Sequence, residues 1–213
     1  NSIFKLKKTK TEMPPRALKE NVKVKGHCLC EQVMDIAVPV FSLQLYCNPT
    51  LFWLAEPAFF VLCTKTAGEL SIKDLRNQVK ELREMFIYEL VMYPGSEEED
   101  FENTLSILTQ LDVLQSISSD SVRLNEQSPY IIHFLSAISP FLNCYLYTST
   151  VILKSFHEKK FYAKDIFIAV QSSLEQEILT SNYSIHPYSL CLEAITTTML
   201  SLCNIGCLKK EKL

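Results

Sequence analysis

The chain has 213 residues, and 47% of them are hydrophobic, which is enough to bury the core of one domain or of two small ones. Charged residues make up 21% of the chain and the formal net charge is −3, which excludes a disordered polyampholyte and a general polyanion-binding protein. The four glycines (Gly26, Gly68, Gly95 and Gly206) lie too far apart for a Gly-rich phosphate loop, so nucleotide binding through such a loop is disfavoured.

The first 26 residues are more basic than the rest. They contain seven lysines, one arginine and two glutamates, which gives a net charge of +6. Pro14-Pro15 lies in the middle of the segment. We therefore predict a basic linker over residues 1–35, with contact to an anionic membrane surface as the alternative. Because the chain begins with Asn1 rather than Met, we also expect it to be processed or cut from a longer one.

Residues 45–63 form a nearly continuous apolar run that resembles a membrane span at first sight. Pro49, Glu56 and Pro57 interrupt it, and residues 51–63 supply only 13 positions where a span needs about 20. The run therefore predicts a buried or interfacial pair of helices, with Pro57 near the first turn of the second.

Two amphipathic helices are expected next. Ser71 can cap the first, with Asp74 at its third position, and apolar residues at helical spacing continue until Pro94-Gly95 stops it. Ser96 opens the second with a Ser-x-x-Glu capping box to Glu99. The acidic run 97–100 is explained by capping and the helix dipole without a metal ion.

Residues 113–126 alternate apolar and polar positions around Ser118–Ser121, which predicts a small β-hairpin. Two helices followed by a hairpin are the outline of a winged-helix-like unit. A mostly apolar helix follows over 129–156 with Pro140 inside it, and Tyr145, Tyr147, Thr148 and Thr150 suggest that part of it meets polar surroundings.

The outline then repeats in part. Residues 166–178 predict one helix, and Pro187 predicts the first turn of another that ends near residue 206, with a hairpin beginning at Lys209 and left incomplete. The prediction is a mainly α chain with minor β structure. It has a winged-helix-like unit over 36–127 and a helical unit over 128–213 that is truncated at its C-terminal end.

No active site is recognisable in the residues themselves. The eight cysteines form no Cys-x-x-Cys, which favours reduced, intracellular, mostly buried thiols over a zinc or disulfide framework. No acid stands five residues after any of the four histidines, as an acyltransferase His-x-x-x-x-Asp motif requires; these are His27, His133, His157 and His186. We predict no catalytic, cofactor-binding or metal-binding residue in this chain.

Four segments nevertheless resemble, in the same order, the C-terminal half of glycerol-3-phosphate and dihydroxyacetone-phosphate acyltransferases. They are Leu45-Tyr46-x-Asn48 with Pro57-Ala58, Leu82-Arg83 through Pro94-Gly95, Asp100-Phe101-Glu102, and Phe134-Leu135 through Tyr145. The resemblance as a whole extends over about residues 43–207. The Pro-Gly and Asp-Phe-Glu segments are most similar to the dihydroxyacetone-phosphate branch, which implies the peroxisomal first step of ether-lipid synthesis.

The resemblance implies a non-catalytic region of an enzyme that passes an acyl group from acyl-CoA to a small phosphorylated acceptor. The family's His-x-x-x-x-Asp and Pro-Glu-Gly blocks would precede this region, so its expected partners are that catalytic domain and a membrane surface, and it would bind no cofactor itself. Cys47 and Pro49 depart from the Arg and Gln usual in the family. Glu211-Lys212-Leu213 is a poor peroxisomal address, because the peroxisomal members end in an Ala-Lys-Leu-type tripeptide.

A second hypothesis is a stand-alone tandem winged-helix-like module that binds other proteins. A nucleic-acid-binding version needs a basic recognition helix, whereas the predicted second helix opens with Glu97-Glu98-Glu99-Asp100. Nucleic acid is therefore not an expected partner.

Overall fold

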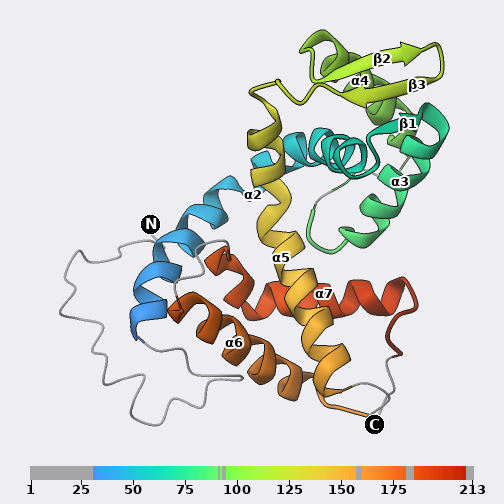
Figure 1. The fold of residues 1–213 in the computed structure, drawn as a ribbon. Coiled ribbons are helices and arrows are strands. Elements are labelled where there is room, and N and C mark those ends of the chain that lie inside the picture. Colours follow the sequence, from blue (N-terminus) through green and yellow to red (C-terminus); the bar gives the residue numbers. More distant parts are fainter. Residues whose placement is uncertain (1–30, 91, 93–94, 157–159, 181–184, 210–213) are drawn as a thin grey trace.

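The computed structural model describes residues 31–90, 92, 95–156, 160–180 and 185–209, although the side chains at 31–36, 40–50 and 52 lie outside this description. The elements are, in order, α2 (Glu31–Ala67), β1 (Glu69–Ser71), α3 (Ile72–Met85), α4 (Glu97–Gln110), β2 (Leu114–Ser118), β3 (Ser121–Leu124), α5 (Ile131–Ser155), α6 (Ala163–Leu179), the 3₁₀ helix η1 (Pro187–Leu190) and α7 (Leu192–Asn204). This order, drawn in Figure 1, confirms a mainly α chain with minor β structure. The basic segment 1–26 lies outside the described residues.

Helix α2 is one helix of 37 residues, so the predicted helix pair is wrong. Pro49 and Pro57 both lie in its interior, and Figure 1 shows its blue and cyan halves running in different directions, as expected where proline interrupts the backbone ladder. The helix continues past Pro57 because the following turns are tightly packed: Ala58, Phe59 and Phe60 are fully buried. Burial of these side chains outweighs the local cost of the proline.

Helix α3 begins as predicted and ends earlier than predicted. The Ser71 hydroxyl accepts a hydrogen bond from the Asp74 backbone N–H at 3.0 Å, which confirms the cap. The helix ends at Met85 rather than at Pro94-Gly95. Phe86 lies just past the end of the helix but is still fully buried, with its ring 5.5 Å from that of Phe59. The helical spacing of apolar residues therefore predicted that Phe86 is buried, although it did not predict where the helix ends.

Helix α4 starts after Ser96 as predicted, but the capping box is wrong. The Ser96 hydroxyl makes no capping bond to the helix backbone; it donates to the Asp100 carboxylate at 2.6 Å. A carboxylate one turn away is the stronger hydrogen-bond acceptor, and it draws the hydroxyl away from the backbone. Phe101 and Leu108 are buried on the inner face of the helix.

The predicted hairpin is present as β2 and β3. Strand β1, which the sequence did not reveal, joins it to give an antiparallel sheet in the order β1-β3-β2. Leu70 in β1 pairs with Val122 in β3, and both side chains are buried. The succession helix, strand, helix, helix, hairpin confirms a winged-helix-like unit, which occupies the upper part of Figure 1.

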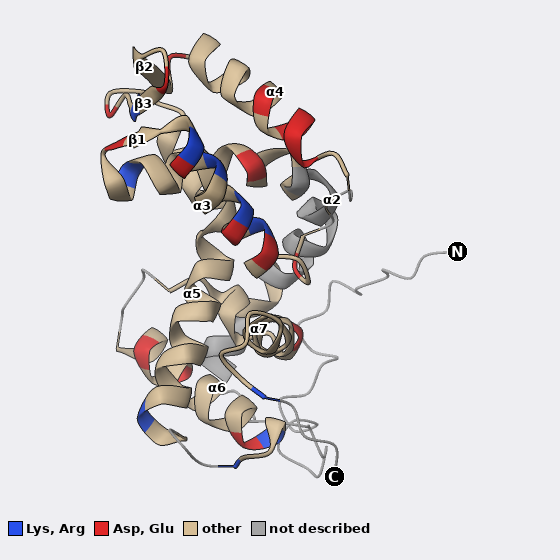
Figure 2. Ribbon diagram, turned by 90° about the vertical axis from the view of Figure 1, so that its right-hand side faces the viewer, with Lys and Arg blue, Asp and Glu red and all other residues tan. Residues whose placement is uncertain are grey.

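Helix α5 is the long helix of the second half. Pro140 lies inside it and cannot bond to the Ser136 carbonyl, and the Ser139 hydroxyl donates to that carbonyl at 3.3 Å instead. Figures 1 and 2 place α5 along one face of the molecule, with α2 and α7 behind it. Tyr145 and Thr148 are buried, and the Tyr145 hydroxyl meets a polar partner inside the protein, the Met85 carbonyl, at 2.6 Å.

By length and composition α5 is also, among the described residues, the one helix that could cross a membrane. Nine of its residues are buried in the protein, and the core helix of a soluble protein has the same properties. The finding is therefore weak support for a membrane span.

The C-terminal part of the chain contains the two predicted helices, but the second does not begin at Pro187. This residue starts η1, which ends before Cys191, and α7 then begins at Leu192 as a separate helix. No strand follows Leu124 in the described part of the chain, and most of the hairpin predicted from Lys209 lies outside it. Likewise, α2 starts at Glu31, inside the predicted linker, whose first thirty residues are not described. The domain boundaries remain a prediction.

The Ser71 cap can be tested by stability. We expect Ser71→Ala to lower the free energy of unfolding by about 1 kcal/mol, because the Asp74 N–H loses its acceptor. Ser71→Thr keeps the hydroxyl and should stay within about 0.5 kcal/mol of the parent. Urea denaturation followed by circular dichroism at 222 nm measures both, and equal losses in the two variants would show that the cap contributes nothing.

Candidate functional site

Two buried polar clusters stand out, and each links elements that are distant in sequence. The Arg83 cluster consists of Glu56, Arg83, Ser96 and Asp100. The Glu89 cluster consists of Glu89, Tyr188 and Thr197, with the Met85 carbonyl and the Tyr145 and Ser201 hydroxyls beside it.

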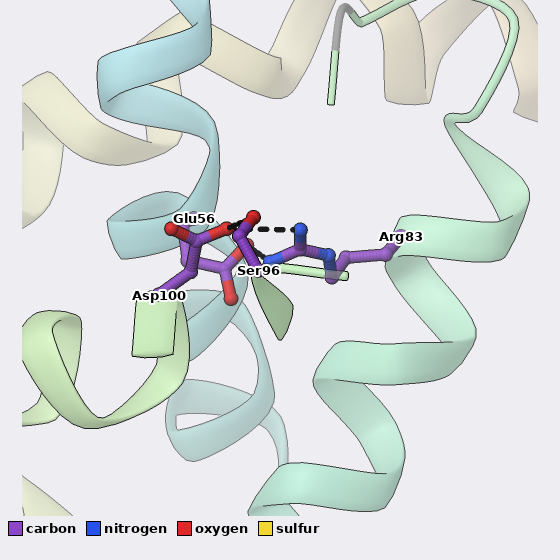
Figure 3. A network of polar contacts seen from close by, with 4 residues as sticks. All are labelled: Glu56, Arg83, Ser96 and Asp100. Atoms are coloured by element: carbon purple, nitrogen blue, oxygen red, sulfur yellow. Dashed lines mark hydrogen bonds and ion pairs between the residues drawn. The ribbon is translucent and has the colours of Figure 1, made fainter. Parts of the chain in front are cut away.

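The Arg83 cluster joins α2, α3 and α4 (Figure 3). One guanidinium nitrogen of Arg83 donates to Glu56 at 2.8 Å and the other donates to Asp100 at 3.1 Å. The Arg83 side chain is only 8% exposed, and that of Glu56 only 14%. Because carboxylates occupy both terminal nitrogens, this arginine is not free to bind a phosphate group.

The electrostatics of the cluster are set by burial. Burial raises the pKa of the Glu56 carboxyl, and the adjacent Arg83 guanidinium opposes that rise without cancelling it. One Glu56 oxygen, Oε1, is buried and has no hydrogen-bond partner among the described residues. Arg83 is therefore the group that makes a buried carboxylate at Glu56 tolerable.

The Glu89 cluster lies in the turn after α3. Thr197 from α7 and Tyr188 from η1 both donate to the Glu89 carboxylate, the latter at 3.3 Å. The Met85 carbonyl at the end of α3 accepts from Tyr145 of α5 at 2.6 Å and from Ser201 of α7. These contacts fasten the end of the winged-helix-like unit to the helices that follow.

Burial dominates the chemistry of Glu89. It raises the pKa of this carboxyl to about 7, although the hydrogen bonds from Thr197 and Tyr188 favour the charged form. The neighbouring Glu193 carboxylate adds repulsion in the same direction as burial. Glu89 thus changes charge near neutral pH while enclosed between α3, α7 and η1.

Both clusters have the contacts of structural networks, since their polar groups bond to one another across helices. Neither cluster contains a histidine or a cysteine, and no group of three His, Cys, Asp or Glu side chains in the described residues could hold a metal ion. Burial raises the pKa of the Cys63 and Cys144 thiols to about 11, which keeps both protonated and unreactive.

Neither of the two described histidines is paired with a carboxylate in the described part of the chain. The His186 ring accepts a bond from the Tyr188 backbone N–H at 3.2 Å and so caps η1, while His133 is exposed. His27 and His157 lie outside the described residues.

An open hollow of about 330 Å³ lies beside the end of α2 and β3, lined in part by Thr64, Lys65, Gln115, Arg123 and Asn125. Its one buried hydroxyl, on Thr64, donates to the Phe60 carbonyl at 2.8 Å and is not a nucleophile.

The Arg83 cluster was not predicted from the sequence, yet its three charged members lie in or directly beside three of the four segments that carry the family resemblance. Glu56 precedes Pro57-Ala58, Arg83 follows Leu82, and Asp100 opens Asp-Phe-Glu. The available signal was a charged residue on the apolar face of an amphipathic helix, since Arg83 falls on the face of Leu75 and Val79. The side chains of residues 45–49 lie outside the described residues.

Removing the arginine should be costly. We expect Arg83→Met to lower the free energy of unfolding by about 3 kcal/mol, because it leaves the largely buried Glu56 carboxylate without its cation. Arg83→Met combined with Glu56→Gln should recover part of that loss, because the second change removes one of those charges.

Arg76 is the matched control on the same helix. It pairs with the exposed Glu98 and Glu102, so Arg76→Met should cost about 1 kcal/mol or less. Urea denaturation of the four proteins at pH 7 measures the difference. Similar losses for the two arginine variants would contradict a special role for Arg83.

Glu89 should make stability depend on pH. Its pKa is about 7 in the folded chain against an ordinary value of 4.5, so the folded state binds more protons between these values and stability falls as pH rises through them. Glu89→Gln should therefore become more stable than the parent as pH rises from 4.5 to 8, by about 3 kcal/mol at most.

The exposed Glu84→Gln change on α3 serves as the control. Its stability difference from the parent should stay flat over the same interval. A flat difference for Glu89→Gln as well would show that the buried carboxyl titrates at its ordinary value.

Comparison with known proteins identifies the family of this chain. A family model described as the glycerol-3-phosphate acyltransferase C-terminal region matches residues 6–211. The chain is 22% identical over 200 residues to the dihydroxyacetone phosphate acyltransferase of Mus musculus, covering 92% of this chain and 29% of that protein. It is 19% identical over 176 residues to the enzyme of the same name from Oryctolagus cuniculus, covering 82% and 26%.

The chain therefore spans less than a third of the length of these curated relatives. No solved structure matches it. Because the family model covers nearly the whole chain, the chain belongs to the family of glycerol-3-phosphate acyltransferase C-terminal regions.

Proposed function

We propose that this chain is the non-catalytic C-terminal region of a glycerophosphate-type O-acyltransferase. The complete enzyme would transfer a fatty acyl group from acyl-CoA to dihydroxyacetone phosphate or glycerol 3-phosphate, and dihydroxyacetone phosphate is the favoured acceptor because both relatives carry that name. Such a reaction belongs to phospholipid and ether-lipid synthesis. It implies an intracellular, membrane-associated enzyme, with the peroxisome favoured over the mitochondrion.

The observation that carries this proposal is the Arg83 cluster. Segments that resemble the acyltransferase family supply its arginine and aspartate, and Glu56 directly precedes a third such segment; the three side chains meet in a largely buried ion-pair network. Their role in this region is then to fix the packing of α2, α3 and α4. Catalysis, and the binding of acyl-CoA, would belong to a preceding domain, which is the main proposed partner of this region.

The alternative is a stand-alone winged-helix-like module that binds proteins. The helix order of the first unit favours it, and its α4 begins with four acidic residues, which Figure 2 shows in red. That charge would repel nucleic-acid phosphates, so a nucleic-acid partner is disfavoured under both hypotheses.

An acyl-transfer assay separates the two. We expect the isolated 213-residue chain to transfer no radiolabelled palmitoyl group from palmitoyl-CoA to dihydroxyacetone phosphate or to glycerol 3-phosphate. A longer product of the same gene, extended upstream through a His-x-x-x-x-Asp block, should acylate dihydroxyacetone phosphate faster than glycerol 3-phosphate. Thin-layer chromatography of the lipid product measures both.

Three outcomes would count against the proposal. Activity of the isolated chain would mean that the site lies within these residues. An initiating Met immediately before Asn1 in the genomic sequence would favour the stand-alone module. Faster acylation of glycerol 3-phosphate would leave the enzyme class intact and overturn the choice of acceptor.

A further inference from the structure

The N-terminal end of α5 has unpaired backbone donors. Tyr130 occupies the N-cap position without a side-chain cap, and no acidic residue lies in the first turn. The backbone N–H groups of Ile132 and His133 have no acceptor in the described part of the chain. Helices α3, α4, α6 and α7 differ, because each has an acidic residue in its first turn. Unpaired N–H groups and the positive end of the helix dipole make this end of α5 suited to an anion.

A buried hydroxyl without a partner lies at the same place. Ser128 is only 8% exposed, and its Oγ atom forms no hydrogen bond with the described residues. A serine followed by a proline is a common start of a helix, with the serine as the cap, yet the Ser128 hydroxyl does not cap α5. Because buried polar groups are rarely left unpaired, this hydroxyl calls for a partner, and a bound ligand can supply it.

These groups border an open hollow of about 410 Å³. Ser128 lines it together with Lys65 from the last turn of α2 and with apolar residues that include Leu124, Pro129 and Ile132. Figure 1 shows why these parts meet, since the chain runs from β3 directly into the first turn of α5 beside α2. A volume of about 300–1,000 Å³ is usual for sites that bind small molecules.

The cations near the hollow are not neutralised within the described part of the chain. Lys65 forms no ion pair there, and it also lines the neighbouring hollow of about 330 Å³, together with Arg123. Arg123 forms no ion pair either, although Glu69 lies opposite it on β1; Glu69 accepts a hydrogen bond from Ser121 at 2.9 Å instead. The other two described arginines each pair with two carboxylates. Two cations are thus available to an anion at this place.

Two features oppose the binding of an anion. Glu126 lines both hollows, and its carboxylate would repel a negative ligand. Lys65 also complements the negative C-terminal end of α2. Glu126 is exposed, so solvent screens its charge, and Lys65, Arg123 and Glu126 together still carry a net charge of +1. The positive end of α5 adds to that charge, so the hollow favours an anion, although not a tightly bound one.

The donors and the apolar wall together select the kind of anion. A phosphate group presents several oxygens, and a lysine ammonium, a hydroxyl and the first N–H groups of a helix are suitable partners for them. The apolar residues of the hollow suit a carbon substituent on the phosphate. We propose that this hollow binds a phosphate monoester, held by Lys65, Ser128 and the first N–H groups of α5. This site goes beyond the proposed acyltransferase role, which assigns no ligand to this region, and does not depend on it.

Titration of the ¹⁵N-labelled 213-residue chain with glycerol 3-phosphate up to 20 mM tests the site by nuclear magnetic resonance. The amide signals of Ile132 and His133 should shift saturably, and glycerol should not shift them. Lys65→Met should raise the dissociation constant about tenfold, because a charge-assisted hydrogen bond is lost. Ser128→Ala should raise it about fivefold, because an uncharged donor is lost.

Two further variants separate the site from general effects of charge or folding. Lys80→Met removes an exposed lysine of α3 that lines neither hollow, and it should leave the dissociation constant unchanged. Glu126→Gln should strengthen binding, because it removes the one carboxylate among the residues that line the larger hollow. Weaker binding by Glu126→Gln, with an amide spectrum otherwise like that of the parent, would overturn the proposed site.

Vesicles distinguish a lipid headgroup from a soluble ligand. The parent and Lys65→Met are sedimented with phosphatidylcholine vesicles that contain phosphatidate, a monoester, or phosphatidylserine, a diester; the basic residues 1–26 are the same in both proteins. Binding to phosphatidate alone that depends on Lys65 identifies a lipid monoester, whereas saturable shifts with glycerol 3-phosphate alone identify a soluble one. The proposal is wrong if neither occurs, if both lipids bind equally, or if Lys65→Met and Ser128→Ala bind like the parent.

Discussion

The rest of the structure depends on how one buried arginine is neutralised. Arg83 leaves the inner face of α3 and meets a carboxylate from α2 on one side and a carboxylate from α4 on the other. An unpaired charge at this depth would be very unfavourable, so the three helices are held in an arrangement that keeps all three groups within hydrogen-bond distance. Apolar packing supplies most of the stability, and the ion pairs select which packing is adopted.

The same helix carries the connection to the second half of the chain. Just after Arg83, the Met85 carbonyl and the Glu89 carboxylate receive hydroxyl groups from α5, η1 and α7. Arg83 therefore organises the winged-helix-like unit, and the residues immediately after it attach that unit to the remaining helices. Glu89 makes this attachment sensitive to proton concentration near neutrality, because its charged form is disfavoured by burial.

The sequence predicted those features that depend on interactions between residues close together in the chain. The Ser71 cap, the hairpin around Ser118–Ser121 and the helical spacing of Leu75 and Val79 each depend on residues a few positions apart. The continuous α2 could not be predicted in this way, because packing around Phe59 and Phe60 overrides Pro57. Strand β1 has three residues, too few to show an alternation, and exists through its pairing with β3. The Arg83 pairs join residues 27 and 17 positions apart, which no spacing rule detects.

The short interval from Arg83 to Glu89 also limits how the family can vary. Inserting one residue there would rotate the following residues by about 100° where the chain is helical and would carry Glu89 away from Tyr188 and Thr197. Insertions and deletions should therefore be absent from this interval in related chains. They should be common at the turn between β2 and β3, where Ser119 and Asp120 are exposed. The positions of insertions and deletions among relatives would then distinguish the segments of this fold that are held by contacts between helices from the exposed turns.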